Sequence, residues 1–207
     1  MLSSAIFMVV YFIFFAAVHS FLADPRSKSR GKKALDKAFD LWQRLVYNLL
    51  ALLMVFPFLF ILAFMPDKTI YIIPAPWSWL MACIQLLAAI ALLVTLRQTG
   101  IFFFMGLSQL QDQDSRPNRG KQLVTGGFYG CIRNPLFFFA AIFLWSSPIM
   151  TENLLAFNIL ATVYFYIGAR HEERSLKDEF GPVYEDYRKN VPMFLPRLRC
   201  SGHPMRK

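Results

Sequence analysis

A short polar segment, residues 123–137 (LVTGGFYGCIRNPLF), carries residue types suited to binding a small molecule. Its three glycines, Gly126, Gly127 and Gly130, let the backbone come close to a ligand and present N–H groups to it. Arg133 follows, just before an apolar run whose first turn would also offer free N–H groups to an anion. The segment therefore predicts a site for a carboxylate or a phosphate at the entrance to a hydrophobic helix.

Two adjacent carboxylates, Glu172 and Glu173, follow a later apolar run and would attract a cation or an amino group at the edge of lipid. Tyr129 adds an aromatic face, which attracts cationic centres. A ligand with a cationic centre, an amino-acid end and an aromatic ring would suit this combination, and S-adenosylmethionine is such a ligand. The glutamates fit glycoside hydrolysis poorly, because neighbouring helical residues point about 100° apart.

Several other chemistries lack their motifs. The chain has no P-loop, HExxH or GxSxG pattern, so ATP hydrolysis, zinc proteolysis and serine hydrolysis have no support. The cysteines Cys83, Cys131 and Cys200 are scattered and show no metal-ligand spacing. We therefore expect neither a bound metal nor a disulfide framework.

The composition indicates a membrane protein. Hydrophobic residues make up 56% of the 207 residues and include 22 Phe, more than a soluble core of this size would hide. We predict an all-α integral membrane protein with about five transmembrane helices, the last two forming a C-terminal helical hairpin around a polar turn. A cleaved signal peptide is the alternative for the first run, but no basic residue precedes that run. The apolar runs cover residues 2–22, 45–65, 77–96, 135–150 and 154–168.

Basic residues give the expected orientation. Residues 24–44 contain seven, residues 97–133 contain five, and the chain after residue 168 contains nine, whereas Lys68 stands alone on the opposite side. The positive-inside rule then places the N-terminus outside and the C-terminus in the cytoplasm. A short basic loop can also bind nucleic acid, but between two spans it more often sets topology, so we expect no nucleic-acid partner. Both polar segments then share the cytoplasmic face.

We expect a single membrane domain over residues 1–207. After residue 168 the chain becomes charged, and apolar residues at helical spacing predict a cytoplasmic amphipathic helical tail, broken at Gly181 and Pro182. Pro57 is expected to kink the second span. Within the domain we expect a three-span bundle at 1–97, a cofactor-binding core at 98–196 and a mobile tail at 197–207.

Each candidate residue also has a structural interpretation. The glycines could form a turn at which the chain enters the membrane, and Glu172 could begin a solvated stretch of helix. Arg133 could reach lipid phosphates without touching a ligand. His19, at the inner end of the first run, could bond a loop carbonyl rather than line a site. Ligand binding is favoured because both polar segments converge on one face.

The same segments resemble a known family. Residues 123–137 are similar to the LVxxGxYxxxRHPxY signature of isoprenylcysteine carboxyl methyltransferases and related membrane methyltransferases. Residues 171–196 resemble the C-terminal pattern EExxLxxxFGxxYxxYxxxVPxxLP of these enzymes. His19-Ser20 and residues 106–110 look more like the methanethiol S-methyltransferase branch. The resemblance implies a cytosolic S-adenosylmethionine pocket, a lateral route for an apolar or lipid-like acceptor, and direct SN2 methyl transfer.

The resemblance also implies roles for individual residues. Glu172 would take the amino group of the cofactor, and Arg133, Asn134 and Glu172 would form the catalytic set. His19 and Arg170 are candidates for contact with the acceptor. A proton from a thiol acceptor could pass to His19, His171 or water, and these three stay open. The cofactor contacts would be Lys121, Gln122, Leu123, Val124, Tyr129, Asn134, Pro135, Phe137 and Glu172.

Three positions depart from the family pattern. Asn134 replaces a histidine, Phe137 replaces a tyrosine, and Gly168 stands where the carboxyl methyltransferases have an arginine. The last change disfavours a carboxylate acceptor and favours a neutral or thiol acceptor. The departures also support an alternative hypothesis, a non-enzymatic membrane sensor or assembly module that kept the scaffold. A double-bond reductase is a third hypothesis, but it would need many more spans.

Overall fold

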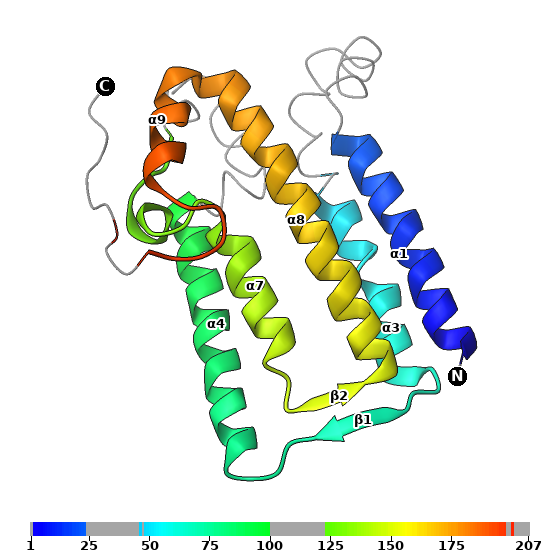
Figure 1. Ribbon diagram of the computed structural model, residues 1–207. Helices are drawn as coiled ribbons and strands as arrows, with labels where there is room; N and C mark the ends of the chain where they lie inside the picture. Colours follow the sequence, from blue (N-terminus) through cyan, green and yellow to red (C-terminus); the bar gives the residue numbers. More distant parts are fainter. Residues whose placement is uncertain (1, 24–45, 47, 100–122, 198–199, 201–207) are drawn as a thin grey trace. The chain divides into compact units, whose positions relative to one another are not determined.

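A computed structural model describes residues 2–23, 46, 48–99, 123–197 and 200 of the chain (Figure 1). The predictions for the basic loop at 24–44, for Lys121 and Gln122 and for the end of the tail lie outside these residues. The chain divides into two compact units, each assembled from separate stretches of sequence. The first contains residues 1–73, 101–115 and 149–160, and the second contains residues 74–100, 116–148 and 161–207.

In the first unit, helix α1 (Leu2–Ala23) packs on helix α3 (Phe56–Phe64) through aromatic side chains. Phe58 is the centre of this cluster and is almost completely buried. Its ring centroid lies 4.8 Å from that of Tyr11 and 5.4 Å from that of Phe157, within the range of favourable aromatic pairs. Large rings thus fill the space between helices that have few polar groups.

The second apolar run is interrupted just before Pro57, as the sequence predicts. The helical segment Asn48–Phe64 breaks at Met54 and Val55, and Pro57 lies in the first turn of α3. Proline lacks an N–H and is tolerated at that position of a helix. The Tyr11 hydroxyl donates to the Met54 carbonyl at 2.9 Å, so the break is stabilised by α1.

The predicted polar turn at 151–153 is wrong. Strand β2 (Ile149–Thr151) pairs antiparallel with strand β1 (Thr69–Ile72), and helix α8 (Glu152–Phe180) begins directly after β2. The strands are rich in β-branched residues, which favour extended backbone. The Asn153 N–H also donates to Asp67 Oδ1 at 3.1 Å and fixes the start of α8. The fold is therefore mostly helical with a two-stranded ribbon, rather than all-α.

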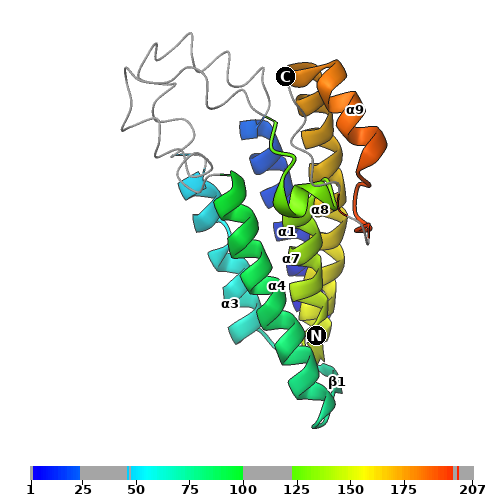
Figure 2. The same cartoon turned by 90° about the vertical axis from the view of Figure 1, so that its left-hand side faces the viewer.

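In the second unit, helices α4 (Trp77–Thr99) and α7 (Pro135–Trp145) lie side by side (Figure 2). Gln85 Nε2 donates to the Phe143 carbonyl at 3.1 Å and links the two helices. Trp145 Nε1 donates to Thr162 Oγ1 of α8 at 2.9 Å, so α7 is also fixed to the next helix of the predicted hairpin.

Helix α8 ends at Phe180, and helix α9 (Pro182–Asn190) follows beside it (Figure 2). Gly181 between them has φ +53°, a left-handed conformation that glycine adopts without a steric cost. Tyr184, Tyr187 and Val191 form a buried cluster against Leu123, Leu176 and Phe180. This cluster attaches the C-terminal segment to the loop that precedes α7.

Two helices of the described chain are long and apolar enough to cross a bilayer, Ser4–Leu22 within α1 and the whole of α4. Only 11% of each span is buried within the protein, so most of its apolar side chains need lipid rather than water around them. The protein is therefore a membrane protein. The 11 residues of α7 extend about 16 Å, much less than a hydrocarbon core of about 30 Å, and the count of about five spans stays a prediction.

Candidate cofactor-binding site

The glycine-bearing loop is a short 3-10 helix, η2 (Gly127–Gly130), held by α4. Gly127 has φ +60°, which L side chains rarely adopt, and the Gln98 side chain lies in contact with the place that a Cβ would occupy. Gln98 Oε1 accepts a hydrogen bond from the Phe128 N–H at 3.3 Å. The sequence gives no local signal for this role of Gln98.

The C-terminal segment holds the other side of the loop. The Tyr187 hydroxyl donates to the Tyr129 carbonyl at 2.7 Å, and the Arg133 N–H donates to the Pro192 carbonyl at 2.9 Å. Cys131 forms a disulfide with Cys200, although the odd, scattered set of cysteines argues against a disulfide framework. The scattered spacing misled that prediction, because the chain after α9 returns to the loop from 69 residues away.

Arg133, Asn134 and Glu173 form a buried polar cluster at the start of α7. Arg133 Nε lies 2.8 Å from Glu173 Oε1, and both side chains are only 9% exposed. The N–H does not point at the oxygen, so the contact is an ion pair rather than a directed hydrogen bond. Asn134 Nδ2 donates to Glu173 Oε1 and to the Met193 carbonyl, each at 3.4 Å. Glu173 therefore has a structural partner for its charge.

Glu172 has a different environment from its neighbour. Burial raises the pKa of its carboxyl group, and the charge of Glu173 raises it further. Burial also raises the pKa of Tyr129, and the Glu172 charge adds to that shift, which means that these two groups are electrostatic neighbours. The Glu172 side chain is nevertheless exposed at the protein surface. A carboxylate that is short of solvation and still accessible is well suited to binding a cation.

Gly168 and Glu172 lie one turn apart on the same face of α8. Phe137 of α7 packs there, with its ring stacked on Phe165 at a centroid distance of 5.7 Å. A Cβ at Gly168 would lie 3.4 Å from the Phe137 ring, so this ring fills the space beside the glycine. The two departures from the family pattern, Phe137 and Gly168, are therefore packed against each other.

The remaining predicted site residues are spread over different places. Pro135 is buried in the first turn of α7, Leu123 packs on the α9 cluster, and Val124 is exposed. His19 belongs to the first unit, where its ring stacks on Phe15. Arg170 is exposed and points about 200° around α8 from Glu172, so the structure does not bring these two residues together.

Replacing Gly127 with alanine should destabilise the loop by about 1–2 kcal/mol, because alanine resists a positive φ and displaces Gln98. Thermal unfolding of the purified protein would measure this loss. Gly126→Ala is the matched control, since Gly126 has φ −91° and nothing lies within 4 Å of the place that its Cβ would occupy. Equal midpoints for the two variants would contradict the prediction.

Fold and site define a helical membrane protein whose loop before α7 and last long helix form one polar site. A methanethiol S-methyltransferase of Bradyrhizobium diazoefficiens is 31% identical over 192 residues, which are 89% of this chain and 70% of that protein. A methanethiol S-methyltransferase of a Pseudomonas species is 42% identical over 69 residues, 33% of this chain and 26% of the relative. The protein-S-isoprenylcysteine O-methyltransferase of Schizosaccharomyces pombe is 32% identical over 89 residues, 41% of this chain and 37% of the relative. No family model and no solved structure matches the chain.

The chain belongs to the isoprenylcysteine carboxyl methyltransferase-like family, with several relatives in its methanethiol S-methyltransferase branch. The family that the sequence resembles is thereby confirmed. The relatives that define this membership are named as methyltransferases of thiols and of prenylcysteine.

Proposed function

We propose that the protein transfers a methyl group from S-adenosylmethionine to a small thiol or to a lipid-like acceptor of the prenylcysteine type. The observation that carries this proposal is the meeting of two distant segments at the buried Arg133–Glu173 ion pair, 2.8 Å long, since Tyr129 and Glu172 lie on those same segments and are electrostatic neighbours. A desolvated but accessible carboxylate beside an aromatic ring fits a ligand with an amino group and a sulfonium centre.

In this proposal Glu172 binds the amino group, and the backbone of the loop contacts the rest of the cofactor. Tyr129 and Phe137 supply aromatic surface, and Leu123 and Val124 contribute mainly backbone. Asn134 and Pro135 fix the chain at the start of α7. Lys121 and Gln122, which lie outside the described residues, remain proposed contacts on the basis of the family resemblance.

The cofactor supplies an electrophilic methyl group on a sulfonium, so the protein needs to give little acid or base assistance. Its residues must align the acceptor with that methyl group and keep water out. A thiol acceptor reacts as its thiolate, and His19, His171 or water remain candidates to take the proton. The transfer breaks the bond from methyl to sulfonium sulfur and forms the bond from methyl to the acceptor.

Arg133 and Asn134 act, in this proposal, through the cluster that they form with Glu173. Their contacts to Glu173 and to the Met193 carbonyl hold the loop against the C-terminal segment. We therefore assign both as positioning residues, and reserve direct contact with the cofactor's amino group for Glu172.

The acceptor is proposed to be a thiol or another neutral group rather than a carboxylate. Phe137 packs at Gly168, where the carboxyl methyltransferases have an arginine, and makes that position apolar. Arg170 does not compensate, because it lies on the other side of α8. His19 remains a proposed acceptor contact.

The proposed topology has about five spans, with the N-terminus outside and the C-terminus in the cytoplasm, because the basic residues then fall on one side. The loop at 123–137 and Glu172 would face the cytoplasm, where the cofactor is available. An apolar acceptor would enter laterally from lipid.

A non-enzymatic module is the second candidate function. One observation favours it: Arg133 and Asn134, at the positions of the family's arginine and histidine, both contact Glu173 and so serve a structural role. Such a module would bind the cofactor, or nothing, and would methylate no acceptor.

Incubation of the purified protein with labelled S-adenosylmethionine and a panel of acceptors tests the proposal. The panel is methanethiol, a prenylcysteine and phosphatidylethanolamine, with each product identified by mass. We expect methylation of a thiol or of the prenylcysteine. Binding of the cofactor without transfer to any acceptor would favour the module, and no binding at millimolar cofactor would contradict the proposed cofactor site.

A further inference from the structure

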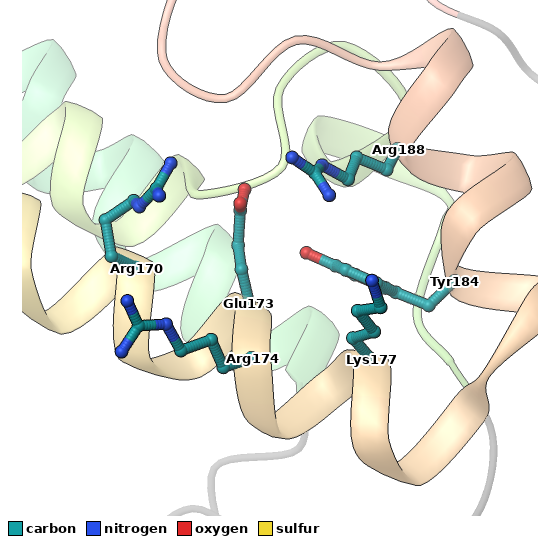
Figure 3. Close-up of a pocket in the computed structure, with 6 residues that line it drawn as sticks. All are labelled: Arg170, Glu173, Arg174, Lys177, Tyr184 and Arg188. Atoms are coloured by element: carbon teal, nitrogen blue, oxygen red, sulfur yellow. The ribbon is translucent and has the colours of Figure 1, made fainter.

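A second polar site lies between the charged end of α8 and helix α9, both within the second unit. This pocket has a cavity volume of ≈ 70 Å³ (Figure 3). One water needs about 10–15 Å³ by the same measure, so the pocket has room for a group of several heavy atoms. Its lining residues are Arg170, Glu173, Arg174, Lys177, Tyr184 and Arg188.

The lining is strongly basic. Its one carboxylate, Glu173, already neutralises Arg133 from the other side. Lys177 pairs with the partly exposed Glu185 at 2.7 Å, and Arg188 approaches the same carboxylate at 3.8 Å. Arg170 and Arg174 form no ion pair with an acidic group in the described part of the chain. The pocket therefore has positive charge in excess.

Tyr184 supplies the second, independent observation. Its side chain is almost completely buried, and its hydroxyl forms no hydrogen bond with any described residue. Figure 3 shows this hydroxyl pointing from α9 into the pocket, toward Glu173, with Arg188 above it and Lys177 below. Burial raises the pKa of Tyr184 to about 12, and the charge of Glu173 contributes, so the group remains a donor.

A buried hydroxyl without a partner is uncommon and calls for a missing group. Lysine and arginine side chains are donors only, so the cations around Tyr184 offer no acceptor for its proton. Glu173 is the one acidic side chain in the lining, and its carboxylate forms no hydrogen bond with this hydroxyl. A group with acceptor oxygens and negative charge would satisfy both the hydroxyl and the surrounding cations. Guanidinium groups match the oxygens of a phosphate in a forked geometry, which makes phosphate a better fit than a simple halide.

The pocket is separate from the face that carries Glu172. Arg170, Glu173, Arg174 and Lys177 recur at spacings of three and four along α8 and so share one side of it. Glu172 lies about 100° from Glu173, away from that side. An occupant of the pocket would therefore not compete with a ligand of Glu172.

We propose that this pocket binds the phosphate group of a phosphomonoester or phosphodiester. A phospholipid headgroup and free phosphate share this chemistry. The Tyr184 hydroxyl donates to one phosphate oxygen, and Arg170, Arg174 and Arg188 surround the others. The proposal does not depend on methyl transfer.

The test uses the full-length protein in maltoside micelles, which carry no phosphate group. One arm adds inorganic phosphate to the solution, and the other adds phosphatidylglycerol to the micelles. Isothermal titration measures phosphate binding, and native mass spectrometry measures retained phosphatidylglycerol. Selective retention of phosphatidylglycerol with no phosphate binding identifies a headgroup site, and the reverse identifies a free-phosphate site. Binding of neither probe overturns the proposal.

Variants show whether any bound probe sits in this pocket. Neutralising Arg170 and Arg174 together, as R170Q and R174Q, should weaken binding of the successful probe at least about tenfold, because two charge-assisted contacts are lost. Lys189→Gln is the matched control, since Lys189 is exposed on α9 and pairs with Asp186 outside the pocket. Equal binding by the double variant and the control would overturn the proposal.

The Tyr184→Phe variant tests the pocket independently, even if the double arginine variant folds poorly. Without any anion, this variant should unfold at the same or a higher temperature than the parent, because it lacks the unpaired buried hydroxyl. With the successful probe, its gain in thermal midpoint should be smaller than that of the parent. An equal gain, or displacement of the probe by S-adenosylmethionine, would contradict a separate phosphate site.

Discussion

Glu172→Gln should weaken S-adenosylmethionine binding about 10–100-fold, since it removes one charge-assisted hydrogen bond worth about 1.5–3 kcal/mol. Glutamine keeps the size of the side chain and loses only the charge that the cofactor's amino group would pair with. Equilibrium binding of labelled cofactor to the purified protein measures the change. The thermal midpoint without cofactor should not fall, because the Glu172 charge is itself poorly solvated.

The raised pKa of Glu172 predicts how folding stability and cofactor binding depend on pH. Its pKa is raised in the folded protein, first by burial and then by Glu173, so the stability that it contributes is present at low pH and is lost as pH rises through the raised pKa. Cofactor binding should change in the opposite sense and strengthen over that window, because the amino group needs the ionised carboxylate. In Glu172→Gln both pH dependences should flatten.

Glu179→Gln is the matched control for these measurements. Glu179 lies seven residues further along α8, on nearly the same face, and is exposed. Its replacement should leave cofactor binding and its pH dependence unchanged. An equal loss in both variants would mean that general negative charge, rather than the Glu172 site, attracts the cofactor.

Glu173→Gln should be the most destabilising single change in the second unit, at about 3–5 kcal/mol, because it leaves the buried Arg133 guanidinium without its counter-charge. Chemical or thermal unfolding in detergent would measure the loss. The double variant Arg133→Met/Glu173→Met should recover most of it, since no uncompensated charge then remains in the buried site.

The exposed pair Lys177–Glu185 provides the comparison for that experiment. Glu185→Gln removes an ion pair of similar length, 2.7 Å, but both side chains are substantially exposed, so we expect little change in stability. Similar losses for Glu173→Gln and Glu185→Gln would contradict the structural role that we assign to the Arg133–Glu173 pair.

The sequence by itself determined the membrane-crossing helices and the two segments of the site. The run 77–96 is too apolar to be stable in water and is about long enough to cross a bilayer. Its composition alone therefore predicts a membrane-spanning helix. The sequence also predicts the break before Pro57 and the end of α8 at Gly181, because proline and glycine act through their own backbone geometry. The family pattern in the two segments rests on the same local information.

Only the tertiary structure decided how the two glutamates differ. Adjacent in sequence, Glu173 pairs with Arg133 from 40 residues away, while Glu172 points about 100° away from it around the helix and forms no such pair. The pairing of β1 with β2 and the unpaired Tyr184 hydroxyl were hidden for the same reason. Such features depend on which distant segments come into contact, and a local pattern of residues does not predict these contacts.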